Sequence, residues 1–131
     1  MHSLDVRTSR HTEFVNLDDS LQRIIDESGV SNGFLHVFVP HTTAGVTINE
    51  NADPDVRRDL EKILDRAFPW EGGYAHAEGN SAAHMKASAI GFHQTVFIED
   101  GHMALGTWQS LFFCEFDGPR SRSVWVRVVP Q

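Results

Sequence analysis

The chain has 131 residues, 40% of them hydrophobic and 22% charged, a balance typical of one globular domain of about 100–150 residues. Acidic residues outnumber basic residues by 18 to 11, so the formal net charge is −7. Proteins bind nucleic acids and anionic membranes through Lys and Arg, so this charge argues against both partners and leaves small polar ligands open. No apolar signal segment opens the chain and no run reaches ~18 apolar residues, so we expect a cytoplasmic protein formed by a single domain over residues 1–131.

A short strand and an amphipathic helix are predicted at the start of the chain. The strand spans Leu4–Thr8. In the helix, apolar side chains share one face at helical spacing: Leu17, Leu21, Ile24 and Ile25. Asn16 is the expected N-cap, and Gly29 is the expected stop.

Two strands and a second helix follow. The apolar run Phe34–Val39 ends at Pro40 and predicts a strand buried on both faces, whereas Gly45–Asn49 alternates apolar and polar residues. Asp53 as N-cap and Pro54 at the first helical position mark a strong helix start. The apolar stripe of this helix contains Val56, Leu60, Ile63, Leu64 and Ala67.

The rest of the chain predicts a short helix and then β-structure. The helix spans Ser81–Ile90, and a hairpin turns at Asp100-Gly101. Two longer strands follow, over Trp108–Phe116 and Ser123–Val129. Two or three helices with about six strands, mostly joined by hairpins, indicate an α+β fold.

Most standard catalytic motifs are absent. The chain has no Gly-rich dinucleotide fingerprint, P-loop, H-E-x-x-H zinc motif or nucleophile elbow. His76-Ala77-Glu78 matches the first half of a zinc deaminase motif, but a single cysteine, Cys114, cannot supply the second half. We expect Cys114 to be a small buried residue in a strand.

Polar residues gather where the predicted strands end. His41 follows Pro40 directly, and Asn49, Glu50 and Asn51 stand between a strand and a capped helix. Binding residues often lie at such ends, because a rigid element fixes them while a loop gives access. The alternative is that the two asparagines shape the turn and Glu50 is solvated.

Histidine is unusually frequent, with eight in the chain. His41, His76 and His84 could form an open divalent-metal site that leaves one coordination position for water or substrate. No pair among them has local ligand spacing, so ordinary hydrogen-bonded or exposed histidines remain the alternative. His36 is expected to pack against its strand neighbours. The others are expected at the surface: His2, His11, His93 and His102.

A second polar group lies near the C-terminus. Glu115 shares one strand face with Gln109, so it either ends a wet site or lies at an edge. Arg120 and Arg122 follow a turn and could hold a phosphate with bidentate hydrogen bonds; alternatively they are solvated and paired with Asp117. Trp108, close to Gln109, is either a core residue or a stacking platform for a ring.

Three segments resemble the hallmarks of the YjbQ-like family of small proteins. His41-Thr42-Thr43-Ala44-Gly45-Val46-Thr47-Ile48-Asn49-Glu50-Asn51, followed by Asp53-Pro54, resembles the first hallmark. Ala83-His84-Met85-Lys86, with His76 upstream, and Gly106-Thr107-Trp108-Gln109 resemble the second and third. The hallmarks occur in the expected order, and the similarity covers nearly the whole chain. The resemblance implies an α+β fold with a mostly antiparallel β-sandwich core, assembled as a homotrimer.

The resemblance also implies a function. Members are commonly described as secondary thiamine-phosphate synthases, which join hydroxymethylpyrimidine diphosphate to a thiazole phosphate with loss of pyrophosphate. It implies a metal-associated polar pocket around His41, His76 and His84, with zinc as the expected metal and magnesium as the alternative for a diphosphate substrate. Glu50 and Glu115 are the candidate catalytic carboxylates. The candidate residues for binding a small phosphorylated substrate are Asn49, Lys86, Trp108, Gln109, Arg120 and Arg122.

Two other functions stay open at this point: a metal-dependent phosphohydrolase, and a non-catalytic trimer that binds a metabolite or a metal. Large aromatic residues crowd the last two predicted strands and exceed what one small core is expected to cover, which also favours a trimer. The alternative is that all of them face the core of one chain: Trp108, Phe112, Phe113, Phe116 and Trp125.

Overall fold

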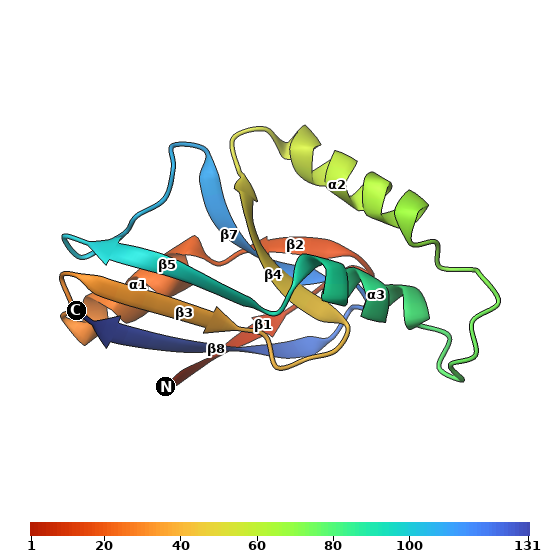
Figure 1. Cartoon of the computed structure of the whole chain (residues 1–131), viewed down its shortest axis with the longest axis horizontal. Coiled ribbons are helices and arrows are strands. Elements are labelled where there is room, and N and C mark those ends of the chain that lie inside the picture. Colours follow the sequence, from red (N-terminus) through yellow and green to blue (C-terminus); the bar gives the residue numbers. More distant parts are fainter.

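Residues 1–131 are all described by a computed structural model, which contains three helices and eight strands (Figure 1). The helices are α1 (Asp18–Ser28), α2 (Pro54–Ala67) and α3 (Ser81–Ile90). The strands are β1 (His2–Arg7), β2 (Glu13–Asn16), β3 (Gly33–Phe38), β4 (Ala44–Glu50), β5 (His93–Glu99), β6 (His102–Met103), β7 (Gln109–Glu115) and β8 (Ser121–Pro130). No helix is both long enough and apolar enough to cross a membrane.

Two antiparallel sheets form the framework. The five-stranded sheet has the order β1-β8-β3-β5-β6, and the three-stranded sheet has the order β2-β7-β4. Every strand pair is antiparallel. The predicted single-domain α+β fold with a mostly antiparallel core is therefore confirmed.

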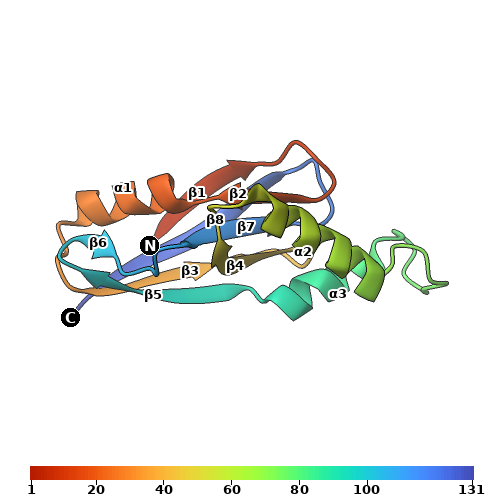
Figure 2. The same ribbon diagram turned by 90° about the horizontal axis from the view of Figure 1, so that it is seen from above.

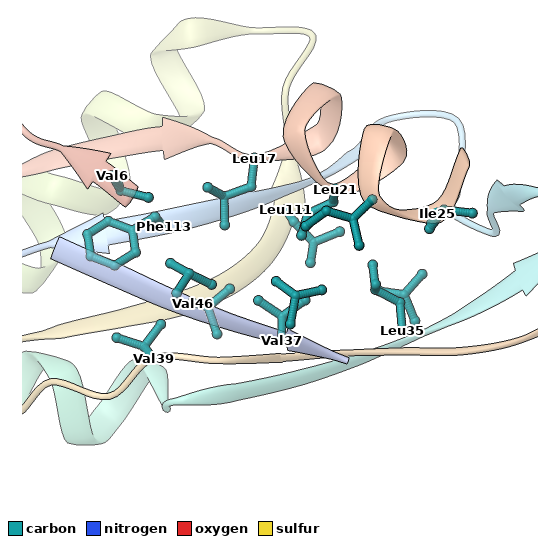
Figure 3. Packing of buried hydrophobic residues seen from close by; sticks show 14 of the residues in the cluster. Val6, Leu17, Leu21, Ile25, Leu35, Val37, Val39, Val46, Leu111 and Phe113 are labelled. Atoms are coloured by element: carbon teal, nitrogen blue, oxygen red, sulfur yellow. The ribbon is translucent and has the colours of Figure 1, made fainter. Parts of the chain in front are cut away.

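The main core fills the space between the two sheets (Figure 3). Leu35 and Val37 of β3 are fully buried, as are Val46 of β4 and Leu111 and Phe113 of β7. Burying a side chain of this size stabilises the fold by about 1.5–3 kcal/mol. Helix α1 extends the same core with its predicted apolar face: Leu21, Ile24 and Ile25.

Strand β7 is buried on both faces, so Glu115, the polar residue at its end, is buried as well. Leu111 and Phe113 face the main core, while Phe112 and Cys114 pack in a second cluster with Ala83 of α3. The expectation that Cys114 is buried is confirmed. Because residues alternate along a strand, Glu115 has the inward orientation of Phe113 and lies fully inside the molecule.

Helix α2 begins as the sequence predicts but is weakly packed. The Asp53 carboxylate accepts a hydrogen bond from the Asp55 N–H (2.9 Å), and Pro54 occupies the first helical position. None of its residues is buried, and Ile63 is 58% exposed. Figure 2 shows α2 beside α3, and Figure 1 shows α2 on the opposite side of the three-stranded sheet from β8. The apolar stripe of α2 is therefore only partly covered in one chain.

The sequence-based prediction for β3 was wrong in one respect. Leu35 and Val37 are fully buried, but Phe34 is 37% exposed and Phe38 is 42% exposed. The outer face of the five-stranded sheet is open, because no helix covers it in this chain. The apolar run predicted burial on both faces of the strand, but only every second residue of β3 is buried.

The start of α1 also differs by one position. Leu17 is the N-cap residue, without a side-chain cap hydrogen bond. The Asn16 carboxamide oxygen instead accepts from the Asp18 N–H at 2.8 Å, one residue before the cap. The predicted stop is confirmed, because Gly29 ends the helix in the left-handed region with φ 70°.

Candidate functional site

A buried ion pair lies where β7 and β8 meet the turn between them. Arg122 Nε donates to Glu115 Oε1 at 2.8 Å, and Arg122 Nη2 donates to Glu115 Oε2. The hydroxyl of Thr8 donates to Glu115 Oε1 at 2.7 Å, and Arg122 Nη2 is 2.9 Å from the hydroxyl of Thr43. The Asp117 N–H completes the set by donating to Glu115 Oε2 at 3.1 Å. Every polar atom of the Glu115 carboxylate thus has a partner.

These contacts determine the charge of Glu115. Burial raises the pKa of the carboxyl, but hydrogen bonds from Arg122, Thr8 and the Asp117 N–H outweigh burial and hold the pKa below its ordinary value. Glu115 is therefore ionised at neutral pH. A carboxylate in this state and with these partners positions Arg122 and has no proton to donate.

His41 lies beside this pair. Its Nε2 accepts a hydrogen bond from the Ser123 N–H at 2.9 Å. Burial lowers the pKa of His41, and the positive charge of Arg122 lowers it further. The ring is accordingly neutral at pH 7, and with Nε2 as acceptor the proton is on Nδ1.

A second carboxylate connects the turn to the start of α3. Asp117 Oδ2 accepts from Asn80 Nδ2 at 2.9 Å and from Arg120 Nη2 at 2.8 Å. Burial raises the pKa of Asp117, but the hydrogen bonds from Asn80 and Arg120 lower it below its ordinary value. Arg120 is half exposed, whereas Asn80 is buried with its side-chain oxygen unpaired. We name Thr8, His41, Thr43, Glu115, Asp117, Arg120 and Arg122 the polar cluster.

The three histidines expected to bind a metal do not form a metal centre within one chain. The rings of His76 and His84 meet edge to face with centroids 5.4 Å apart, at the start of α3. His41 is not grouped with them, and no set of three or more His, Cys, Asp and Glu side chains in the chain is arranged to hold a metal ion. One physical reason is that the Nε2 lone pair of His41 is already used by Ser123. The trio therefore does not fit the expected zinc ion in a single chain, although two of its members lie together.

Other predicted site residues lie at the opposite end of the same strands. Ala44 pairs with Glu115, whereas Glu50 pairs with Gln109, so β4 and β7 run from the polar cluster to the far end of the three-stranded sheet. With a rise of about 3.3 Å per residue, the two ends are roughly 20 Å apart. We name Asn49, Glu50, Trp108 and Gln109 the distal group.

The distal group is exposed and continuous with the start of α2. Trp108 is 62% exposed, so it is not the core residue that the sequence left open. Its carbonyl accepts from the Asn51 N–H at 2.9 Å, and Asn51 Oδ1 in turn accepts from Arg57 of α2 at 2.7 Å. Gln109 Oε1 accepts from the Gly106 N–H at 2.8 Å, which closes the turn before β7.

Lys86 is buried, unlike most lysines. Its ammonium group donates to Asp65 of α2, and only 2% of its side chain is exposed. Lys86 and Arg122 both carry their charge inside the chain, each against a carboxylate, so neither reaches solvent in this conformation. Of the predicted cationic binding residues, Arg120 alone has an exposed guanidinium group.

Sequence analysis did not single out several members of this site. Thr8 and Thr43 reach Glu115 and Arg122 from distant segments, and Thr8 is 107 positions from Glu115 in the chain. His11, expected only at the surface, has its Nε2 3.7 Å from Asp117. No local pattern marks these residues, because the contacts exist only once β1 pairs with β8.

The fold and the site together define a small α+β protein with two stacked antiparallel sheets and charged residues buried at one end of the shorter sheet. Residues 2–131 match the family described as UPF0047 protein YjbQ-like, and the chain belongs to this family. It is 43% identical over 130 residues to UPF0047 protein YugU of Bacillus subtilis, a match that covers 98% of each chain. It is 46% identical over 124 residues to a UPF0047 protein of Methanocaldococcus jannaschii, covering 95% of this chain and 90% of the relative.

Solved structures confirm the architecture. A crystal structure of a YjbQ/UPF0047 family protein from Clostridium acetobutylicum is 51% identical, covers 98% of this chain and 100% of its own, and superposes with a TM-score of 0.97. A protein from Aeropyrum pernix is 32% identical, with 99% and 98% covered and a TM-score of 0.94. None of these names states a reaction.

Proposed function

We propose that this protein is an enzyme of the secondary thiamine-phosphate synthase type, acting on a small phosphorylated substrate at the polar cluster. The observation that carries the proposal is the convergence of Asn80 and Arg120 on Asp117. Through Asp117, a half-exposed guanidinium lies next to the start of α3, where His76 and His84 also meet. Free backbone N–H groups and the positive end of the helix dipole favour anions at such a start.

We assign to the chain's own residues the binding of the negatively charged phosphate groups of the substrate. Arg120 uses Nε and Nη2 within the chain, which leaves Nη1 for an oxygen of a phosphate or diphosphate. His41 offers its Nδ1–H as a neutral donor, because Nε2 is occupied by Ser123. In pyrophosphate loss these two groups would stabilise charge on the leaving group. Arg122 is neutralised by the Glu115 carboxylate and is buried, so it is assigned no contact with the ligand.

The metal part of the proposal rests on His76 and His84. Their neighbouring imidazoles suit zinc, and a bound cation would supply charge against a diphosphate. Magnesium is the alternative if the diphosphate itself supplies most of the ligands.

We further propose that the protein works as a homotrimer with a site shared between subunits. The distal group lies roughly 20 Å from the polar cluster by strand length, too far for one small substrate to contact both in the same chain. Both Trp108 of the distal group and Ile63 of α2 are strongly exposed. If a neighbouring copy covers this surface, Glu50 and Trp108 of one subunit would lie near the polar cluster of the next.

The test is product formation by purified protein without a His-tag. Hydroxymethylpyrimidine diphosphate and thiazole phosphate, with zinc or magnesium, should give thiamine phosphate in the wild type. Arg120→Gln should reduce the rate, while Arg23→Gln, at an exposed position of α1, serves as the control. No thiamine phosphate with either metal would contradict the assigned reaction. Release of phosphate from simple phosphate esters under the same conditions would instead identify a metal-dependent phosphohydrolase.

A non-catalytic, metabolite-binding trimer is the second candidate. It is favoured by one observation: Glu115, one of the two candidate catalytic carboxylates, is ionised and fully hydrogen-bonded. In that case the substrates should raise the unfolding temperature without being turned over, because a ligand that binds only the native state stabilises it.

A further inference from the structure

A separate pair of histidines lies on the outer face of the five-stranded sheet. His36 of β3 and His93 of β5 approach each other with 3.3 Å between Nδ1 of His36 and Nε2 of His93. The hydroxyl oxygen of Thr95 is 3.1 Å from the first nitrogen and 3.3 Å from the second. The three atoms thus form a nearly equilateral triangle of donor atoms.

The strand register explains why this triangle forms. His36 pairs with Thr95 across β3 and β5, and Phe38 pairs with His93. His36 and His93 are therefore diagonal neighbours on one sheet face, within reach of long or aromatic side chains. The rings are nearly parallel, with an interplanar angle of 16° and centroids 5.5 Å apart. The facing nitrogens are positioned by the sheet and do not depend on a loop.

The spacing matches the demands of a metal ion. Two nitrogens at about 2.0–2.1 Å from a tetrahedral zinc ion are about 3.3 Å from each other. We propose that His36 and His93 bind a divalent transition-metal ion of the zinc class, through Nδ1 and Nε2 respectively. The Thr95 hydroxyl lies beside both nitrogens, where it can contact the metal or a water bound to it.

The surroundings indicate what completes the coordination. The pair lines a groove of about 580 Å³ whose other walls include Phe38, Trp125 and Arg127. Arg127 is the cross-strand partner of His36 on β8, and no Asp or Glu lines the groove. In a chain of net charge −7, a groove with one guanidinium, two imidazoles and no carboxylate favours a small anion as the exogenous ligand.

The histidines of this groove differ from those assigned to the proposed function. His76 and His84 belong to the loop before α3 and to α3, whereas His36 and His93 belong to β3 and β5. The inference therefore does not depend on thiamine-phosphate chemistry and can be tested in protein that lacks the other histidine pair.

The experiment is a calorimetric titration of the tag-free His76→Ala/His84→Ala protein with zinc chloride. We expect one zinc ion per chain to bind in this background. His36→Ala and, separately, His93→Ala should each weaken that binding roughly tenfold or more, since one of two protein nitrogens is lost. His102→Ala, at another histidine on the same sheet, should leave it unchanged. His36→Gln repeats the test with a side chain of similar size if the alanine variant is poorly folded.

Two results would overturn the inference. One is the absence of zinc binding in the His76→Ala/His84→Ala protein, which would identify the His36–His93 contact as an ordinary hydrogen bond. The other is zinc binding of equal strength with and without His36. Neither result bears on thiamine-phosphate formation, so the two proposals fail separately.

Discussion

Glu115, at the end of β7, and Arg122, at the start of β8, form a buried ion pair that we expect to stabilise this end of the two strands. Both side chains are almost completely buried, and each hydrogen-bonds to a threonine as well as to the other. Removing one partner from such a pair leaves an uncompensated buried charge, which is costly, whereas replacing both with apolar groups often is not.

We therefore predict that Glu115→Gln destabilises the protein by about 3–5 kcal/mol, because Arg122 is left buried without a counter-ion. The double variant Glu115→Leu/Arg122→Met should recover most of that loss. Urea unfolding of the three proteins gives the comparison. An effect of Glu115→Gln no larger than that of an ordinary surface substitution would contradict the assigned role of the pair.

The lowered pKa of Glu115 predicts a pH dependence. Its ordinary value is 4.5, and the folded value lies below it, so the stabilisation is fully present above about pH 4.5. It is lost as the pH falls through the folded pKa, where the carboxylate becomes protonated. The unfolding free energy of the wild type should thus fall more steeply below pH 4.5 than that of Glu115→Leu/Arg122→Met. Parallel pH profiles for the two proteins would argue against it.

Among the elements, α2 is attached to the body of the protein by few contacts. Lys86 of α3 donates to Asp65 of α2, and Leu64 packs against the cluster formed by Phe112 and α3. Lys86 is buried, whereas Asp65 is exposed. Removing the Asp65 carboxylate therefore leaves a buried charge without a partner, but removing the Lys86 ammonium group leaves only a solvated carboxylate.

Asp65→Asn should destabilise the protein by about 1–3 kcal/mol, since a buried ammonium group loses its counter-ion. Lys86→Met, which replaces the buried charge with an apolar chain of similar length, should remain within about 1 kcal/mol of the wild type. Denaturant midpoints measure both. Equal losses of unfolding free energy in the two variants would contradict this prediction, because they would show that the burial of Lys86 does not determine the cost of breaking the pair.

The same elements show what local sequence can predict. The bounds of α3 and the cap of α2 follow from caps, stops and a proline at the first helical position, all local features, and the structure confirms them. The hairpin at Asp100-Gly101 is confirmed because both residues have positive φ, at 51° and 79°. The open outer face of β3 was missed, because whether a sheet face is covered depends on the whole topology.

The sequence predicted which residues belong to the candidate site but not how they are arranged in space. Glu115, Arg120 and Arg122 are adjacent to one turn, and the structure keeps them together. Glu50 and Glu115 are both on paired strands, but opposite ends of antiparallel strands meet, so the register separates the two carboxylates. Sequence spacing contains no information on register over such distances.

At the scale of the whole molecule, the proposed trimer is supported by apolar side chains that one chain leaves exposed. Of the five aromatic residues expected to exceed the core, Phe112, Phe113 and Phe116 are buried, whereas Trp108 and Trp125 are exposed. The apolar stripe of α2 adds to the uncovered surface, with Ile63 at 58% exposure. Large apolar side chains exposed in this way favour burial against a neighbouring subunit.

We predict a trimer by light scattering at micromolar concentration. Ile63→Asp should shift the mass towards that of the monomer, because a carboxylate would be buried in the interface. Lys62→Asp, at the neighbouring position outside the apolar stripe, is the matched control and should remain trimeric. A monomer mass for the wild type would refute the shared site.

The most direct test of the account is the binding of inorganic pyrophosphate, because it requires the polar cluster to recognise a phosphorylated ligand without requiring turnover. Calorimetric titration of tag-free protein should show one pyrophosphate per chain, bound roughly tenfold more weakly by Arg120→Gln and unchanged by Arg23→Gln. Equal affinity in all three proteins, or no binding by the wild type, would contradict the assignment of the polar cluster as the substrate site.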